Sequence, residues 1–402
     1  MNWYSMQSKI KNRRLFTISN LIGICSSFYL ATYLVLRGGL AEAPLILVSL
    51  ISLITLLFDH RESLLSGLKR NDSWFVYALI LFGVWTTITV WIHNGDVSFY
   101  ETPARLILGG LVAIPILKIG VDIRWIQLGA IIGTVLLSYT FLLTYSGGRF
   151  APTINATKWG NSIAFQSILC FSLAIVSKGM LKKSIFLLFS MLGFFFVGLT
   201  GTRGAFLPLV LSLIFFGVLV GSAHKRKAII SLLVIAFLSV GVSNVPIVKD
   251  RIAATQGDML RISQDDFKGS MGQRLTMWYA GFQEGIRNPV LGGGYDFHKT
   301  MTAFDAPTSG LASAASLISK SHSNHHSVYV DTLARTGFIG LILFLAILFL
   351  GLRNSDTRIT LLCIAPFVGF AGAGLSDSVL QLGITVTYFV FSGAILKSVK
   401  FG

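Results

Sequence analysis

The chain reads Gly272-Gln273-Arg274, then Asn288-Pro289-Val290-Leu291-Gly292-Gly293-Gly294, then Ser321-His322-Ser323-Asn324-His325-His326, all within one polar stretch between Val248 and Gly337. This stretch of about ninety residues contains no apolar run long enough to cross a bilayer. On both sides of it the sequence is a series of such runs. The pattern predicts an extramembrane loop that carries chemistry and is held over a helical membrane body.

The composition is typical of a polytopic membrane protein. Hydrophobic residues make up 53% of the chain and charged residues only 12%, whereas a soluble domain carries about 25% charged residues. The net charge of +16 is expected to mark loops on the cytoplasmic side of a lipid bilayer, and no nucleic-acid partner is expected. The three cysteines lie in apolar runs without Cys-x-x-Cys spacing, so we expect them to be small buried side chains.

Apolar runs predict an all-α fold with about twelve transmembrane helices and one large loop that contains short helices. The expected organisation is a transmembrane part at 1–247, the catalytic loop at 248–337 and a second transmembrane part at 338–402. The predicted spans are 15–36, 43–58, 74–92, 106–117, 125–145, 162–176, 185–199, 205–220, 229–245, 338–352, 359–375 and 380–396.

Lysine and arginine set the expected orientation. They gather in the N-terminal tail, in alternate short loops and in the C-terminal tail, while the intervening short loops carry few of them. Cytoplasmic loops are enriched in these residues. Both termini are therefore predicted to be cytoplasmic, and the large loop is predicted to face the opposite compartment, which is the periplasm or the exterior in a bacterium.

Two arginines are candidate anion-binding residues. Arg203 lies in Gly-Thr-Arg-Gly at the outer end of a span, where an arginine costs free energy unless it is hydrated or paired; the alternative is a side chain that anchors the membrane edge. Arg274 lies in the first turn of an amphipathic helix predicted over 273–287. Its planar guanidinium group matches a phosphate, and the alternative is an exposed surface charge.

A group of histidines gives the strongest chemical signal. His322, His325 and His326 are spaced so that one helix face could carry them. Ser323 or Asn324 is a suitable N-cap for a helix that would continue to about residue 335. His325 and His326 would then lie in its first turn, where backbone N–H groups favour a bound anion and the helix dipole favours a neutral imidazole.

A neutral histidine beside a bound phosphate group is suited to accept a proton from a hydroxyl. Zinc binding is an alternative for clustered histidines, although no His-Glu-x-x-His motif is present and Asp331 is the only nearby carboxylate. A purely structural histidine group is a third possibility. A second acid, Asp377, ends the span 359–375 on the outer side, where it could orient an arginine or a histidine, or cap the span.

Three features in this order resemble the O-antigen ligase and polymerase superfamily. They are a Thr-Arg-Gly turn after a span at 202–204, a Gly-x-Arg motif that leads an amphipathic helix into Asn-Pro at 272–289, and His326 followed eleven residues later by Gly337 before another span. The Gly-Leu-Ser-Asp ending at 374–377 is similar to that of enterobacterial-type O-antigen ligases. The resemblance covers the second half of the chain, and the first six spans match only in hydropathy.

The resemblance implies a metal-independent, cofactor-free, inverting glycosyltransferase with a membrane-embedded, GT-C-like fold in the bacterial inner membrane. Such ligases act in lipopolysaccharide biosynthesis. They take an O-antigen glycan from undecaprenyl diphosphate at the periplasmic face and join it to a sugar hydroxyl of lipid A–core.

Residue by residue, Arg203 and Arg274 match the family's diphosphate-binding arginines, and His326 matches its essential histidine. His322, His325 and Asp377 would be supporting residues. Ligases often carry His-Asn where this chain has His326 followed by serine and preceded by His325, so both of these histidines remain candidates for the acting one.

Other functions fit the same pattern. An O-antigen polymerase uses the same donor but a second lipid-linked glycan as acceptor, and an O-linked protein glycosyltransferase belongs to the same superfamily. A flippase or transporter of lipid-linked glycans would be expected to carry charged or broken spans and a smaller loop. The spans of this chain hold almost no ionisable residues, which disfavours transport.

Overall fold

The computed structural model describes residues 18, 20–31, 46–47, 49–51, 70–145, 156–221, 246–381 and 383–401, and most of these are helical. The first long helices are α3 (Arg70–Ile92), α4 (Glu101–Ile119), α5 (Ile123–Thr144), α6 (Ala156–Val176), α7 (Met180–Leu199) and α8 (Phe206–Gly221). Four helices of the polar stretch follow: α10 (Pro246–Ser263), α11 (Ser270–Arg287), α12 (Phe297–Thr302) and α13 (Ser309–Ile318). The last helices are α14 (Val328–Leu352), α15 (Thr357–Cys363), α16 (Phe370–Gly374) and α17 (Gly383–Lys397).

Shorter elements join these helices. Turns of 3-10 helix lie at η1 (Val97–Tyr100), η2 (Arg203–Ala205) and η4 (Val379–Gln381), and the π-helical turn η3 (Ile364–Gly369) joins α15 to α16. Two-residue strands, β1 (Val121–Asp122) and β2 (Val399–Lys400), pair in parallel.

Short polar side chains and a glycine set several helix ends. Asp122 accepts the backbone N–H of Arg124 at the start of α5, and Asp356 does the same for Arg358 at the start of α15. Each carboxylate satisfies a donor that has no partner within the helix. Helix α4 ends at Gly120, whose φ of 74° is favourable for glycine and unfavourable for other residues.

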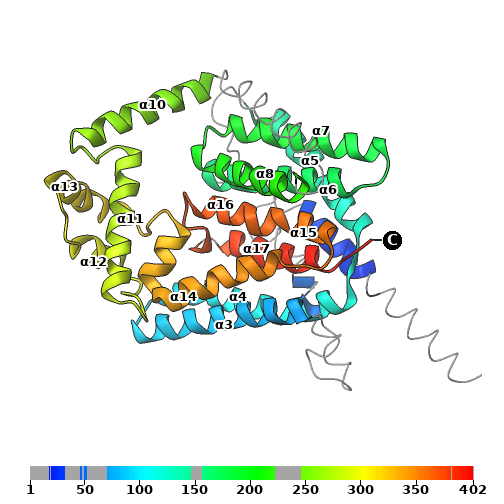
Figure 1. Cartoon of the computed structure of the whole chain (residues 1–402), viewed down its shortest axis with the longest axis horizontal. Helices are drawn as coiled ribbons and strands as arrows, with labels where there is room; N and C mark the ends of the chain where they lie inside the picture. Colours follow the sequence, from blue (N-terminus) through cyan, green and yellow to red (C-terminus); the bar gives the residue numbers. More distant parts are fainter. Residues whose placement is uncertain are drawn as a thin grey trace, which may run out of the picture.

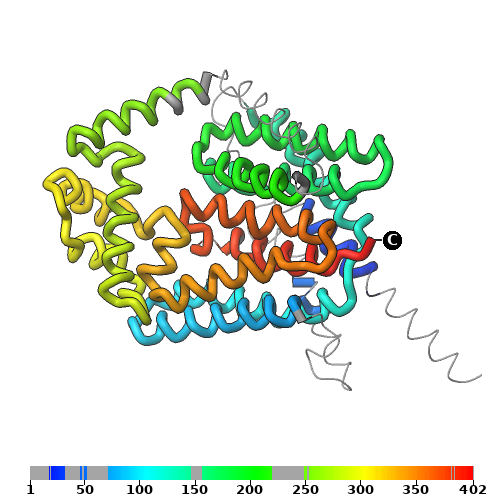
Figure 2. Tube along the Cα trace, viewed as in Figure 1, coloured from blue at the N-terminus to red at the C-terminus, as the bar shows by residue number. Residues whose placement is uncertain are grey.

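The helices form a body and a cap. The long helices run side by side, whereas α10 to α13, which we call the cap, gather at the end of the molecule away from the C-terminus (Figure 1). Helix α14 passes from the cap into the body and packs along α3, although the two helices are far apart in sequence (Figure 2). The polar stretch therefore covers one end of the helical body.

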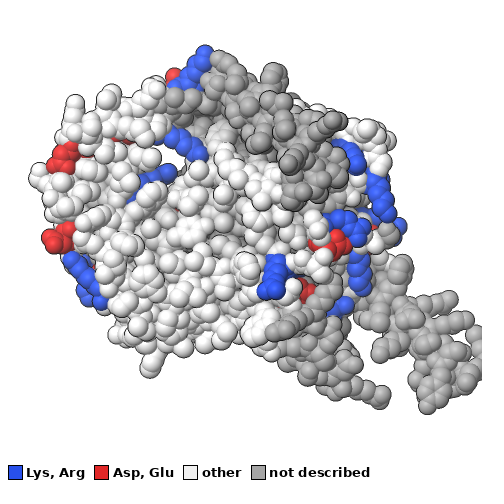
Figure 3. Space-filling model, in the orientation of Figure 1, with Lys and Arg blue, Asp and Glu red and all other residues white. Residues whose placement is uncertain are grey.

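The body has the length and hydropathy of a membrane domain. Among the described residues, the segments long and apolar enough to cross a membrane are seven: 71–92, 97–119, 123–144, 156–176, 180–199, 328–352 and 357–374. Lys and Arg gather near the ends of the face shown in Figure 3, and the broad surface between them is uncharged. The chain is thus an all-α, multi-pass membrane protein, as its composition predicted. The span predicted at 229–245 and most of that at 43–58 lie outside the described residues, so the total of about twelve stays a prediction.

Helix α6 lies at the centre of the body, and small side chains let its neighbours approach. Gly193 of α7 lies so close to Ser167 that an added Cβ would be 2.8 Å from the serine Cβ. The Ser167 hydroxyl donates to the carbonyl of Ser190 (2.7 Å), and the Gln166 amide donates to the carbonyl of Ala130 in α5 (2.9 Å). Small residues and interhelical hydrogen bonds of this kind hold helices together where lipid removes the hydrophobic driving force.

A break at Gly337 connects the cap to the body. The sequence predicts a loop helix to about residue 335 and a span from Phe338, and the structure joins both in α14 with a non-helical Gly337 (φ 69°, ψ −171°) between them. The N–H of Phe338 donates to the carbonyl of Pro289 (2.8 Å), and a Cβ at Gly337 would overlap the carbonyl oxygen of Val290. The Asn-Pro motif that ends α11 is therefore docked on the bend of α14.

Candidate active site

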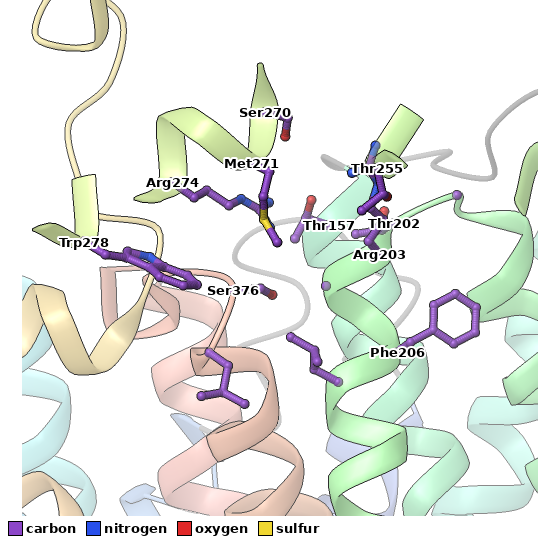
Figure 4. A pocket seen from close by; sticks show the side chains of 14 residues that line it. Thr157, Thr202, Arg203, Phe206, Thr255, Ser270, Met271, Arg274, Trp278 and Ser376 are labelled. Atoms are coloured by element: carbon purple, nitrogen blue, oxygen red, sulfur yellow. The ribbon is translucent and has the colours of Figure 1, made fainter. Parts of the chain in front are cut away.

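A cavity of about 830 Å³ lies between the cap and the end of the body that the cap covers. Figure 4 shows that α11 forms one wall, with Arg274, Met271 and Trp278, and that the turn with Thr202 and Arg203 lies opposite. Figure 3 shows a hollow beneath α10 with Lys and Arg side chains at its rim. Apolar side chains of α8 and the end of α16 complete the lining: Phe206, Leu207 and Leu375.

Arg203 is placed by the turn between α7 and α8. Gly201 takes a positive φ of 60°, and Gly204 packs so closely on Ser376 that a side chain there would overlap the serine hydroxyl. These glycines bring the backbone against the end of α16 and leave the guanidinium group at the cavity. Its Nη1 lies 3.7 Å from Oδ2 of Asp258 in α10, and the side chain is 32% exposed. Arg203 therefore borders the cavity, whereas a simple membrane anchor would face lipid headgroups.

Arg274 extends from α11 into the same cavity. The helix begins at Ser270, earlier than the sequence predicts, and Gly272 in it lies against the backbone of Phe267, where a Cβ would be 2.6 Å from the Phe267 Cα. Among the residues that the structure describes, none forms an ion pair or a hydrogen bond with the Arg274 side chain. Burial lowers its pKa, the charge of Asp377 partly offsets this, and the charge of Arg203 lowers it further.

The two arginines thus place positive charge in one partly enclosed space. An arginine stays protonated under all physiological conditions, and a partly desolvated charge without a close partner is unfavourable. Because Arg203 also disfavours the charge on Arg274, an anion bound between them would relieve both effects. The cavity is therefore suited to a ligand with more than one negative charge.

The histidine loop differs from the predicted helix start. Helix α14 begins at Val328 with Ser327 as its N-cap residue, so the predicted cap at Ser323 or Asn324 is wrong and the histidines precede the helix. The side chain of Asn324 accepts the N–H of His326 (3.0 Å), and His326 takes a left-handed φ of 48°. An asparagine side chain competes with helical hydrogen bonds in this way, which explains why the helix starts later.

His325 points into the packed interior of the cap. Its side chain is 2% exposed, its Nδ1 lies 2.9 Å from Oδ1 of Asp331, and its ring contacts Phe297 edge to face at 5.0 Å. Gly281 of α11 lies against the same ring, where an added Cβ would be 2.6 Å from the His325 Cδ2. His325 is therefore enclosed by protein on all these sides and is a structural residue.

His326 faces Asp377, which directly follows the cavity-lining residues Leu375 and Ser376. Its Nδ1 lies 3.8 Å from Oδ1 of Asp377, and its ring contacts that of His322 edge to face at 5.4 Å. Burial, followed by the charge of Arg274, lowers the pKa of His326 to about 4. Burial also raises the pKa of Asp377 above its usual range, although the charge of Arg274 opposes this. The imidazole is thus neutral at physiological pH. Burial and the charge of Arg274 cause this, whereas the sequence predicted that the helix dipole would do so.

Three residues of the site had weak or no signals in the sequence. Asp258 pairs with Arg203 from a distant helix, and no local pattern marks it. Asp331 accepts the backbone N–H and the Nδ1 of His325, contacts Nε of Arg335 at 3.1 Å and accepts a hydrogen bond from Gln381. The spacing of Asp331 and Arg335 by four residues on one helix is the signal that could have revealed this pair.

Within the described ranges, no three His, Cys, Asp or Glu side chains gather in a way that could hold a metal ion.

Comparison with protein families gives a match over part of the chain. Residues 186–345 match the family model described as O-antigen ligase. The matched range runs from α7 into α14 and contains Arg203, Arg274 and His326, while Asp377 lies outside it. No curated protein matches the chain.

Proposed function

We propose, on the premise that this is an O-antigen ligase-type membrane protein, that it transfers an O-antigen glycan from undecaprenyl diphosphate to a sugar hydroxyl of lipid A–core at the periplasmic face of the inner membrane. One observation carries the proposal: Arg274, half-buried, shares a cavity with Arg203, beside a neutral His326. Two cations suit a diphosphate, and a neutral imidazole suits the deprotonation of a hydroxyl.

The donor would bind with its diphosphate between the two arginines. A guanidinium group can hold two phosphate oxygens at once, so each arginine would contact one phosphate. The apolar side chains of Phe206, Leu207 and Leu375 lie on the side of the membrane body and would contact the start of the polyprenyl chain. The glycan would then extend toward His326.

The reaction needs charge stabilisation and one base. The bond between the sugar C1 and the diphosphate oxygen breaks, and the leaving undecaprenyl diphosphate takes the electron pair. The arginines stabilise the negative charge that develops on it. The acceptor oxygen attacks C1 from the opposite face, which inverts the anomeric centre, and its proton passes to His326. Asp377, 3.8 Å from Nδ1, would stabilise the imidazolium that forms.

The polymerase and the O-linked protein glycosyltransferase remain the second candidates, because they share this donor chemistry and differ in the acceptor. A transporter is disfavoured by the polar groups of the cavity, which lie at the outer end of the body and not along a path through it.

The test is a lipopolysaccharide gel from a ligase-deficient strain that still makes the matching lipid-linked glycan. The wild-type chain is expected to restore the long-chain ladder on lipid A–core. Arg274→Ala is expected to lower transfer by about 100-fold or more and His326→Ala to abolish it, with both variants present in the membrane. Arg287→Ala is the matched control, because Arg287 is an exposed residue of the same helix that donates to the carbonyl of Ala303.

No ladder with wild-type chain in the membrane would contradict the ligase proposal. Growth of lipid-linked glycan in a polymerase-deficient strain would then identify a polymerase.

A further inference from the structure

A second cavity, of about 240 Å³, lies at the outer ends of α3 and α4 against the first turns of α14. The segment 375–381 borders both cavities, because Leu375 and Ser376 line the first, and Leu380 and Gln381 line the second. Between these two pairs lies Asp377, which faces His326. His326 therefore contacts the segment that joins the linings of the two cavities.

The chemistry of the second cavity differs from that of the first. Asp331 and Arg335 are paired along one wall of it, on α14, and Glu101 is paired with Arg105 at 2.7 Å, so its charges are balanced. The ring centroids of Phe99 and Tyr295 lie 4.8 Å apart. The Cζ atom of Arg335 lies 5.4 Å from the centroid of Phe99 and 5.3 Å from that of Tyr295. Balanced charges give no preference for a phosphate. Aromatic faces beside mixed donors and acceptors suit a ring that has hydroxyls and an apolar face.

The wall of this cavity also holds the histidine loop. Asp331 binds the backbone N–H and the ring of His325, and Nη2 of Arg335 donates to the carbonyl of Ser323 (2.9 Å). These contacts attach Ser323 and His325 of the short loop 323–326 to residues that line the cavity. A ligand that contacts Asp331 or Arg335 would therefore be fixed relative to His326.

We propose that the second cavity binds the sugar of the acceptor glycolipid whose hydroxyl is glycosylated, while the first cavity binds the donor diphosphate. This inference rests on the proposed glycosyltransferase function. The site has room for one sugar ring and is smaller than the donor cavity, which agrees with an acceptor that is recognised by its terminal sugar.

Two substitutions on one short turn provide the test. Ser98 lines the cavity from its exposed rim, so Ser98→Trp fills the cavity without removing a buried contact. The neighbouring Val97 is 85% exposed and does not line the cavity, so Val97→Trp adds the same bulk to the same turn and is the matched control. Initial rates are measured in proteoliposomes with undecaprenyl-diphosphate glycan as donor and lipid A–core as acceptor.

Ser98→Trp is expected to raise the KM for the acceptor by at least tenfold and to leave the KM for the donor within twofold. Val97→Trp is expected to leave both within twofold. An unchanged acceptor KM in Ser98→Trp, or an equal rise in the donor KM, overturns the proposal.

A binding measurement separates this inference from the proposed function. Delipidated core oligosaccharide is titrated into the purified full chain in detergent, with wild type, Ser98→Trp, Val97→Trp and Arg274→Ala. Binding that is lost only in Ser98→Trp supports an acceptor-sugar site even if wild type transfers no glycan, in which case the ligase proposal alone fails. Transfer by wild type with equal binding by all four proteins retains the ligase proposal and refutes the acceptor site. Absence of both transfer and binding refutes both.

Discussion

His325 and His326 are adjacent in the chain but lie in different environments. His325 is enclosed and bonded to Asp331, whereas the side chain of His326 is 30% exposed and faces Asp377. The left-handed backbone at His326, which the Asn324 side chain holds, separates the directions of the two side chains. The structure therefore places the adjacent histidines in different environments, one in the packed interior of the cap and one beside Asp377.

Substitution of each histidine is expected to affect a different property. His325→Ala removes one hydrogen-bond partner of Asp331, which keeps Arg335 and Gln381, and creates a void beside Phe297. We therefore expect a loss of about 2–4 kcal/mol in stability. His326→Ala is expected to change stability by less than about 1 kcal/mol, because the residue is partly exposed, and to abolish transfer. Thermal unfolding in detergent and the transfer assay provide the two readouts. A stable His325→Ala protein, or an active His326→Ala protein, would contradict the assignment.

The acid dependence of transfer is a second test of His326. Its pKa of about 4 means that the base stays neutral well below pH 6.5, so transfer is expected to be constant from pH 8 to about pH 5.5 and to be half-lost near pH 4. His322→Ala removes a charge that lowers this pKa and exposes the ring, so its midpoint is expected to move to higher pH. If activity returns when the acid-treated protein is brought back to pH 7.5, denaturation is excluded as the cause of the loss. A wild-type midpoint near 6.5 would show that the acting base is not buried as described.

As the pH falls, protonation of His326 is expected to lower the stability of the fold as well as the activity. The imidazole of the unfolded chain titrates near 6.5 and that of the folded chain near 4. Between these values the unfolded chain binds the additional proton, so acid destabilises the fold across this window. The contribution of neutral His326 is fully present above pH 6.5 and is lost as the pH falls toward 4.

Among the helices, α14 links the cap to the membrane body. Its first turns carry Asp331 and Arg335, and the rest of it packs along α3 (Figure 2). The break at Gly337 lets the Asn-Pro end of α11 approach the helix, and the Phe338 N–H donates to Pro289. The position of the cap over the cavity therefore depends on this bend.

Gly337→Ala is expected to disturb both the cap and the activity. The backbone at φ 69° and ψ −171° is one that only glycine adopts readily, and a Cβ would overlap the carbonyl oxygen of Val290. We expect a loss of at least about 2 kcal/mol in stability and a transfer rate lowered about tenfold or more. Gly257→Ala is the control, because no atom lies within 4 Å of a Cβ there and alanine is the better helix former. Equal melting temperatures for the two variants would contradict the role of the bend.

In the whole molecule, the cavity, the cap and the polar residues lie at one end of an apolar body (Figures 1 and 3). In the proposed function, a lipid-linked donor would enter this end of the body from the bilayer without crossing the membrane. The proposal requires that the cap face the periplasm.

Labelling of single cysteines tests this orientation. Met259→Cys lies on α10 in the cap and Lys182→Cys at the start of α7, and both positions are exposed. The three native cysteines are buried, which limits background labelling. A membrane-impermeant maleimide that reaches the periplasm is expected to label Met259→Cys in intact cells and Lys182→Cys only after the membrane is dissolved. The reverse pattern would place the cap in the cytoplasm.

The sequence by itself determined the all-α, multi-pass character, the helix that carries Arg274 and the turn that carries Arg203. Hydropathy, helical spacing and the glycine-flanked arginine are local properties, and local properties are readable along the chain. Only the tertiary structure decided which histidine is enclosed in the cap and which faces Asp377, that Asp258 reaches Arg203, and that Asp331 and Arg335 hold the loop 323–326 beside a second cavity. These features depend on which distant segments pack together, and residue spacing within one segment carries no information about its distant partners.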